Sequence, residues 1–188
     1  MPTEPSPDVD HLRETLLDRR AVYRGRLISV LEDRVTLPGG GAATREVVHH
    51  RGAVAVIAVT PDSRVLLVRQ WRHAVGAALW EIPAGTRDEG EDPLGTATRE
   101  LREETGYTAV RWRPLGEGYV SPGYSQELLS FFLAQDLAEG EAASDADERL
   151  DVGLFAAGDI AALVRSRSTD CKTLAGLALA GLLPRTDD

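Results

Sequence analysis

Residues 85–107 decide the fold, and they read GTRDEGEDPLGTATRELREETGY. The first part of this stretch is a loop rich in glycine and acidic residues, and the second part is a helix with both ends marked. Asp92 is a good N-cap, and Pro93 suits the first helical position, where a missing N–H costs nothing. Gly106 suits the left-handed residue that follows a helix. The sequence therefore predicts a loop followed by a helix that begins at Pro93 and ends before Gly106.

Three carboxylates share one side of this predicted helix. Glu100 and Glu104 lie four residues apart and Glu103 follows Glu100 by three, so all three are neighbours on the helix surface. Like charges at this spacing repel by roughly a few tenths of a kcal/mol per pair. The cluster is unfavourable unless a cation lies among the carboxylates, and Mg²⁺ is a cation that takes such oxygen ligands. The alternative is a solvated helix face that Arg99 and Arg102 neutralise.

The composition around this stretch excludes some functions. The chain has 188 residues, of which 43% are hydrophobic and 27% charged. These fractions are close to the average of soluble globular proteins and argue against wholesale disorder. The formal net charge of −9 would repel a polyphosphate backbone, so we expect no nucleic-acid partner. An anionic substrate would have to be met by a metal ion or by a few well-placed arginines.

Cysteine usage and the apolar segments indicate a reducing compartment and no membrane. Cys171 is the single cysteine, so an intrachain disulfide is excluded. The first ten residues contain no apolar segment of the kind found in a secretory signal. The longest apolar stretch, residues 174–183, is far shorter than the roughly 20 residues that cross a bilayer. We therefore expect a cytoplasmic protein that does not associate with a membrane.

The chain divides into three regions. Residues 1–20 are polar or charged and predict a flexible N-terminal arm. Residues 21–50 contain β-favouring segments joined by the turn Pro38-Gly39-Gly40-Gly41, and they predict a small N-terminal β subdomain. Residues 51–188 interleave strands with helices, which indicates a mixed α/β or α+β domain. Within this region, three apolar residues at helical spacing are expected to face the core: Leu94, Ala97 and Leu101.

The spacing of fixed residues within 85–107 is specific. Five residues separate Gly85 from Glu91, seven more precede the run Arg99-Glu100-Leu101-Arg102-Glu103-Glu104, and Gly106 follows after one further residue. This pattern resembles the Nudix box over its whole length, with the single departure that Tyr107 stands where an aliphatic residue is usual. Seven fixed identities at a background of roughly 7% each would match by chance about once in 10⁶ chains of this length.

Similarity to the Nudix family implies a fold and a reaction. The implied fold is α+β, an α/β/α sandwich with a mixed β-sheet, here with a small N-terminal β subdomain. The implied reaction is the attack of water on a nucleoside diphosphate linked to another group, with Mg²⁺ as the cofactor and Mn²⁺ as an alternative. The metal ligands would be the carbonyl of Ala84 and the carboxylates of Glu100 and Glu104.

The same resemblance implies catalytic roles for other residues. Glu103 would be a further metal ligand or a positioning group, and Arg99 would orient a carboxylate such as Glu91. In one branch of the family, a glutamate on the loop after the box helix acts as general base or orients the attacking water, and Glu148 matches that place. A solvated acidic loop has the same composition, and its other acids are the alternatives to Glu148: Asp145 and Asp147.

Two features are similar to the ADP-ribose pyrophosphatase branch of the family. Pro122 lies sixteen residues beyond Gly106, which is similar to a marker of that branch, and the alternative is an ordinary Ser-Pro-Gly turn. The run over residues 44–85 is similar to the same branch nearly throughout. The branch implies hydrolysis of ADP-ribose to AMP and ribose 5-phosphate. It also implies a homodimer that forms through residues 21–50.

The branch further implies residues that bind substrate. Arg51 and Arg72 match positions that hold the phosphates and the terminal ribose, because a planar guanidinium binds two oxygens at once. The alternative is that both are surface arginines at strand ends. Glu81 would hydrogen-bond ribose hydroxyls or cap the pocket loop. The adenine needs a flat apolar surface, for which residues 22–28 are the candidates.

Several alternatives stay open at this point. Within the enzyme class, the substrate is another nucleoside diphosphate sugar, a dinucleotide or an oxidised nucleotide. A non-catalytic Nudix-type module that senses a ligand is a different class, and a purely structural acidic domain is a third. Sensing modules usually lack a box carboxylate, whereas this chain retains all four: Glu91, Glu100, Glu103 and Glu104. The sequence therefore favours an enzyme that acts on a small nucleotide-sugar.

Overall fold

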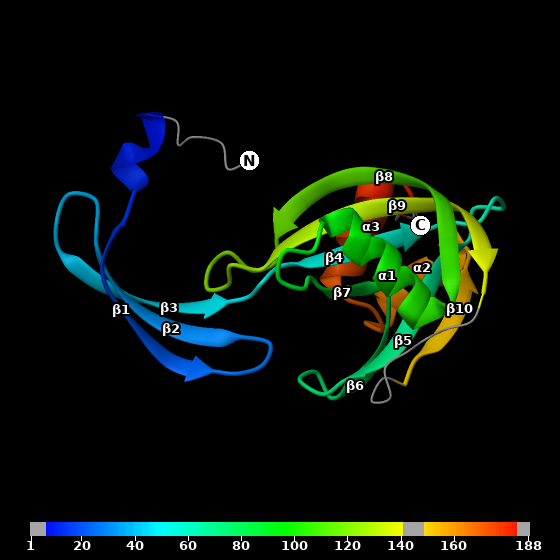
Figure 1. Ribbon diagram of the computed structural model, residues 1–188, viewed down its shortest axis with the longest axis horizontal. Helices are drawn as coiled ribbons and strands as arrows, with labels where there is room; N and C mark the ends of the chain where they lie inside the picture. The colour runs from blue at the N-terminus through cyan, green and yellow to red at the C-terminus, as the bar shows by residue number, and fades with distance from the viewer. Residues whose placement is uncertain (1–6, 141–148, 184–188) are drawn as a thin grey trace. The chain divides into compact units, whose positions relative to one another are not determined.

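The computed structural model describes residues 7–140 and 149–183, which belong to two compact units (Figure 1). One unit comprises the chain up to His50 together with residues 119–127. The other comprises residues 51–118 and the chain from residue 128 onward. The second unit is therefore interrupted by a short segment that joins the first.

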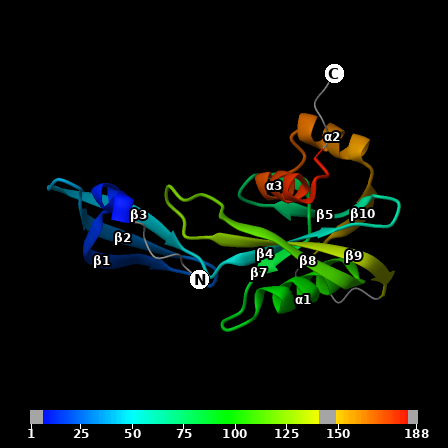
Figure 2. The same cartoon turned by 90° about the horizontal axis from the view of Figure 1, so that it is seen from above.

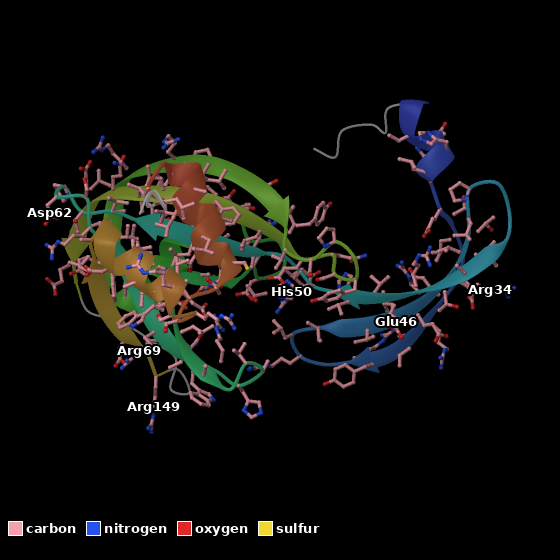
Figure 3. All side chains as sticks on the ribbon, turned by 180° about the vertical axis from the view of Figure 1, so that it is seen from behind. Arg34, Glu46, His50, Asp62, Arg69 and Arg149 are labelled. Carbon is pink, nitrogen blue, oxygen red and sulfur yellow. The ribbon has the colours of Figure 1, made fainter. Side chains whose placement is uncertain are left out.

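The first unit is built on a three-stranded antiparallel sheet in the order β1-β2-β3. Its second and third strands are joined by the predicted glycine turn, in which Leu37 donates its N–H to the Gly41 carbonyl at 3.0 Å. Figure 3 labels Arg34 on the second strand and Glu46 on the third. The elements are the 3₁₀ helix η1 (Pro7–Leu12), β1 (Thr15–Arg24), β2 (Ser29–Thr36) and β3 (Ala42–His49).

The first strand begins earlier than the sequence predicts. Residues 15–20, predicted to lie in a flexible arm, form the first part of β1. Arg19 donates two hydrogen bonds to Asp33, at 2.7 and 2.6 Å, and Arg20 donates to Glu32 at 3.0 Å. The prediction is wrong for these residues because it treated their charges as solvated. On a sheet, opposite charges on neighbouring strands pair instead.

Residues 119–127 pack against the end of β3. Val48 donates its N–H to the Tyr124 carbonyl at 2.7 Å, and Gln126 donates its N–H to the Val48 carbonyl at 3.0 Å. The segment folds back through the predicted turn, because Tyr124 and Ser125 both donate to the Ser121 carbonyl. The first unit thus depends on a segment that is distant from it in sequence.

The second unit contains two sheets, one of four strands and one of three. The four-stranded sheet has the order β7-β4-β9-β8, and it is mixed because β4 is antiparallel to β7 and parallel to β9. The three-stranded sheet has the antiparallel order β10-β5-β6. The strands are β4 (Ala53–Ala58), β5 (Val65–Arg72), β6 (Ala77–Glu81), β7 (Ala84–Thr86), β8 (Tyr107–Tyr119), β9 (Leu128–Glu139) and β10 (Asp151–Phe155).

Helices cover both faces of the four-stranded sheet. Strand β4 is buried throughout, and its side chains alternate between two apolar clusters. Val54 and Val56 pack with Ala97 and Leu101 of α1 (Pro93–Thr105) on one face. Residues of α2 (Ala157–Arg165) and α3 (Cys171–Ala180) pack with Ile57 on the other face. Figure 2 shows α1 on one side of this sheet and α2 and α3 on the other, as the predicted α/β/α sandwich requires.

Helix α1 begins and ends where the sequence predicts. The Asp92 side chain accepts the N–H of Gly95 at 3.1 Å, and Gly106 adopts φ of 77° after the last turn. Leu94 departs from the prediction because it is 40% exposed, and Thr96 is the buried residue of the first turn. Leu94 is not part of the apolar cluster in which Ala97 and Leu101 pack with β4. No helix in the described part of the chain is long and apolar enough to cross a membrane.

Candidate functional site

The loop between β7 and α1 is held in place by its own side chains. Glu91 accepts the N–H of Asp88 through its carboxylate at 3.2 Å and donates its own N–H to the Asp88 carbonyl at 3.1 Å. Gly90, with φ of 78°, allows this tight turn. Arg87 donates from Nη2 to the Glu91 carbonyl at 2.8 Å. The loop therefore delivers Glu91 to the first turn of the helix in a fixed orientation.

Gly85 is required because the carboxylate of Glu100 lies where a side chain would be. A Cβ atom built on Gly85 would lie 2.0 Å from the carboxyl carbon of Glu100 and 2.0 Å from its Oε1. Real Cβ atoms do not approach other atoms so closely, so only glycine admits this arrangement. The glycine of the box thus brings a carboxylate of α1 against the backbone of β7.

Glu104 approaches the same backbone one residue earlier. Its side chain is almost completely buried, and its Oε2 accepts the N–H of Ala84 at 3.0 Å. Together with the packing of Glu100 on Gly85, this contact brings the three predicted metal ligands to one place: Ala84, Glu100 and Glu104. All of them offer oxygen atoms, which are the ligands of hard cations such as Mg²⁺.

Arg99 joins the carboxylates of the loop and the helix. It donates from Nε and Nη2 to the two carboxylate oxygens of Glu91, at 3.0 and 3.1 Å. Its Nη1 donates to Glu100 at 2.8 Å and to Glu103 at 2.9 Å. The predicted contact between Arg99 and Glu91 is therefore present, and the same guanidinium also orients Glu100 and Glu103.

The hydrogen bonds from Arg99 lower the pKa of Glu91 to about 2, against an opposing effect of desolvation, with help from the Asp88 N–H. The pKa of Arg99 is raised by the hydrogen bond to Glu91 in the first place and by that to Glu103. Both groups are therefore charged at every pH at which the protein would be assayed. The pair is a fixed part of the site rather than a titrating one.

The residues present fit a divalent cation, although the protein does not enclose it fully. Among residues 7–140 and 149–183, no three His, Cys, Asp or Glu side chains are grouped so as to hold a metal ion by themselves. Mg²⁺ is usually bound by one or two carboxylates together with substrate phosphates and water. Glu100 and Glu104 provide the two carboxylates, and the glycine at position 85 allows Glu100 to lie against the backbone next to Glu104.

The predicted substrate residues Arg72 and Glu81 bind each other. Arg72 donates from Nε and Nη2 to the two oxygens of Glu81, at 2.8 and 2.6 Å, and Lys172 of α3 donates to Glu81 at 2.6 Å. The side chain of Glu81 is only 3% exposed. Its burial favours the second of the two predicted roles, in which Glu81 supports the pocket loop instead of binding ribose directly.

The cations control the charge of Glu81. Burial alone would raise the pKa of Glu81, but the hydrogen bonds and charges of Arg72 and Lys172 outweigh burial and hold the pKa below its usual value. The hydrogen bond to Glu81 in turn raises the pKa of Arg72, and the negative charges of Asp170 and Glu104 add to that rise. Arg72 is thus within electrostatic reach of Glu104 on the box helix.

Of the remaining predicted residues, Arg51 is described and does not join this cluster. Arg51 lies on the chain just before β4, is about half exposed, and approaches Asp88 of the box loop with 3.9 Å between Nη1 and Oδ1. Glu148 and its alternatives, Asp145 and Asp147, lie outside the described residues. Lys172 was not among the predicted residues, although one signal was available: it is the single lysine in a chain with 20 arginines.

Comparison with family models identifies two regions of the chain. Residues 49–170 match the NUDIX domain, and residues 14–48 match the nucleoside diphosphate sugar hydrolase N-terminal domain. The boundary between the two matches lies near the end of β3.

Curated relatives match most of the chain. An ADP-ribose pyrophosphatase of Bacillus subtilis (strain 168) is 40% identical over 165 residues, which cover 86% of this chain and 89% of that protein. An ADP-ribose pyrophosphatase of Mycobacterium tuberculosis is 43% identical over 131 residues, covering 69% and 63%. A methanol dehydrogenase activator of Bacillus methanolicus is 39% identical over 135 residues, covering 72% and 73%.

A solved structure shares the fold. The structure described as an ADP compounds hydrolase superposes with a TM-score of 0.79 and covers 90% of this chain and 94% of its own. Its sequence is 23% identical to this chain, so the likeness concerns the fold alone. The mixed sheet with helices on both faces is common to the two proteins.

Proposed function

The chain belongs to the Nudix hydrolase family, and from this membership we propose that it hydrolyses ADP-ribose to AMP and ribose 5-phosphate. Water adds to one phosphorus atom of the diphosphate, the bridging P–O bond breaks, and the two monophosphates leave. The observation that carries the proposal is the placement of Glu100 and Glu104 against Ala84 and Gly85. The match to the N-terminal domain model, and the relative whose alignment spans both regions, support the choice of a nucleoside diphosphate sugar.

The cofactor in this proposal is Mg²⁺, with Mn²⁺ as an alternative. Glu100, Glu104 and the carbonyl of Ala84 would hold it. When bound, the divalent ion neutralises the diphosphate and lowers the pKa of a bound water. The donor set supports this choice because its oxygens are hard ligands.

Three arginines and one glutamate are proposed to orient the metal ligands, the substrate and the attacking water. Arg99 fixes the carboxylates of Glu91, Glu100 and Glu103 through the contacts given above, so the site is organised before substrate arrives. In this proposal, Arg72 and Arg51 bind the phosphates through their guanidinium groups. Glu148 is the proposed general base that accepts the proton of the attacking water.

The proposed assembly is a cytoplasmic homodimer that forms through the first unit. Every residue of β1 is exposed in the single chain, although the strand contains several large apolar side chains. An exposed strand with such side chains is suited to cover by a second copy. The apolar residues concerned are Leu16, Leu17, Val22 and Tyr23.

A substrate panel tests the function directly. The purified full chain is incubated with Mg²⁺ and ADP-ribose, other nucleoside diphosphate sugars, dinucleotides and oxidised nucleotides, and the phosphate products are identified. We expect ADP-ribose to give the highest kcat/KM, AMP and ribose 5-phosphate as products, and no turnover after chelation of the metal until Mg²⁺ is added back. The choice of substrate is wrong if ADP-ribose is among the poorest compounds of the panel.

A further inference from the structure

Lys172 of α3 lies between the carboxylates of Glu81 and Asp170. It is the single lysine of the chain, beside 20 arginines. Its ammonium group donates to Glu81 at 2.6 Å and lies 2.8 Å from Asp170 Oδ2, and its side chain is only 16% exposed. An ammonium group is a compact point charge with three donors, which suits a position between two carboxylates.

The start of α3 is fastened to the strand that leads into the box. Trp80 donates its N–H to the Ser168 carbonyl at 2.8 Å, and the Thr169 hydroxyl donates to the Trp80 carbonyl at 2.7 Å. Ile82 donates its N–H to the Thr173 hydroxyl at 3.0 Å in a buried contact. These hydrogen bonds lie on both sides of Glu81, so they fix the position of Lys172 relative to the Glu81 carboxylate. Ala84 follows Glu81 by three residues.

Lys172 is a second cation beside Glu81, and it affects whether the charge of Arg72 is available to a ligand. A buried carboxylate requires a positive partner. If Arg72 were that partner alone, its positive charge would be neutralised by Glu81 and would not be available to a substrate. Lys172 supplies another charge, so Glu81 is satisfied from two sides. Glu81 holds Nε and Nη2 of Arg72, and the side chain of Arg72 remains 41% exposed, with Nη1 outside the paired edge.

We propose that Lys172 is a positioning residue for substrate binding: it holds Glu81 and thereby fixes Arg72 with its charge available to a substrate phosphate. The inference deepens the proposed function and rests on it. Lys172 does not itself touch the substrate in this scheme. Its loss would leave Arg72 as the cation that neutralises Glu81.

A double-mutant cycle tests the role of Lys172. Lys172→Met, Arg72→Ala and the double variant are compared with the wild type in the holoenzyme with Mg²⁺ and ADP-ribose. We expect Lys172→Met to raise KM by about tenfold and to leave kcat within about twofold, since it removes binding made equally in the ground and transition states. Because Lys172 acts through Arg72, the KM of the double variant should equal that of Arg72→Ala. The half-saturating concentration of Mg²⁺ should not change.

Two further comparisons separate positioning from stability. Arg165→Met removes a positive charge from an exposed position on α2 and should leave KM and kcat unchanged. If Lys172→Met fails to fold, Lys172→Gln takes its place in the cycle, because its amide remains able to donate to Glu81. A purely structural lysine would lower the melting temperature and leave KM unchanged, whereas positioning changes KM at temperatures well below melting.

The failure of this inference is distinct from the failure of the proposed function. If the wild type turns over ADP-ribose and Lys172→Met keeps its KM within about twofold, or if the two substitutions act additively on KM, Lys172 has no positioning role. If the wild type does not turn over ADP-ribose, the proposed function fails. Calorimetric binding of a non-hydrolysable methylene analogue of ADP-ribose then decides the role of Lys172, with a tenfold weaker dissociation constant supporting it and an unchanged one refuting it.

Discussion

Two arginine–glutamate pairs lie in the second unit, and they differ in charge balance. Arg99 binds Glu91 through two hydrogen bonds, and Arg72 binds Glu81 in the same way. The guanidinium of Arg99 is shared among three carboxylates, those of Glu91, Glu100 and Glu103. Glu81, by contrast, has Lys172 as a second cation, and Asp170 balances that cation.

The difference indicates what each cluster is suited to bind. A cluster with more carboxylates than cations gains from a further positive charge, which a divalent ion supplies. A cluster with as many cations as carboxylates has no such need, and its exposed guanidinium is suited to an anion. In the proposed function, the two clusters would divide the recognition of a metal–diphosphate complex, and the following substitutions test that division.

The largest effect is expected from Glu104→Gln. The amide oxygen can still accept the Ala84 N–H, so the local fold is retained while the negative charge is lost. We expect kcat/KM to fall by about 10³-fold or more, because charge stabilisation at the diphosphate depends on this cluster. Steady-state kinetics at several Mg²⁺ concentrations measure the effect.

Asp62→Asn is the matched control for Glu104→Gln. It also removes one carboxylate charge, but from the exposed turn between β4 and β5, labelled in Figure 3. Its kcat/KM should stay within about twofold of the wild type, as expected for a surface change away from the site. The assignment of Glu104 to the metal is contradicted if Glu104→Gln retains more than a tenth of the activity.

Gly85→Ala should have the next largest effect. The new Cβ would lie 2.0 Å from the carboxyl carbon of Glu100, so the carboxylate must move away from the β7 backbone. A displacement of about 1 Å in a catalytic group lowers the rate by about 10²-fold, and we expect a loss of that size in kcat.

The matched control for Gly85→Ala is Gly95→Ala in the first turn of α1. The nearest atom to a Cβ at this position lies 3.9 Å away, which is an ordinary contact. Alanine is the better helix former, so this variant should keep full activity and an equal or higher melting temperature. Equal losses of activity in the two variants would mean that the effect of Gly85→Ala does not come from its contact with Glu100.

A smaller effect is expected on stability from the pair of Arg99 and Glu91. The pKa of Glu91 lies at about 2 in the folded chain, below its ordinary value of 4.5. A lowered pKa stabilises the fold above pH 4.5, and this contribution disappears as the pH falls from 4.5 toward 2. We expect Glu91→Gln to lower the free energy of unfolding at pH 7 by about 1–2 kcal/mol, as for loss of a charged hydrogen bond.

Denaturant unfolding at a series of pH values checks this prediction. The difference in free energy between the wild type and Glu91→Gln should be constant from pH 7 to pH 5 and should shrink as the pH approaches 2. A difference that grows as the pH falls has the wrong sign and would contradict a lowered pKa of Glu91.

The two clusters also show how far the sequence predicts the site. The partners of Arg99 lie within eight residues of it, and the cap at Asp92 and the glycine at Gly106 fix the helix that joins them. Local spacing therefore predicts this cluster, including the contact with Glu91. Lys172 and Glu81 lie 91 residues apart, and only the packing of α3 on the sheet brings them together. No local pattern contains that information.

The same distinction accounts for the errors in the fold. The start of β1 at Thr15 depends on cross-strand pairs such as Arg19 with Asp33, fourteen residues apart, and a charged segment gives no local sign of them. Leu94 has the periodicity of a core residue, but it is 40% exposed, and periodicity alone does not show which residues of a helix the rest of the fold covers. Both features are consequences of tertiary structure.

The smallest effect is expected from Arg102→Met, which distinguishes the two arginines of α1. As the alternative to a metal site, the sequence suggested that Arg99 and Arg102 together neutralise the carboxylates, and the structure gives the contacts to Arg99. Arg102 is exposed in the last turn, where a cation interacts with the helix dipole by about 0.3–1 kcal/mol. We therefore expect Arg102→Met to change kcat/KM by less than about twofold and to lower the melting temperature slightly.

Arg99→Met, assayed beside it, should lower kcat/KM by at least about tenfold because it releases three carboxylates at once. Equal effects of the two substitutions would mean that the charge of the helix matters and the contacts of Arg99 do not.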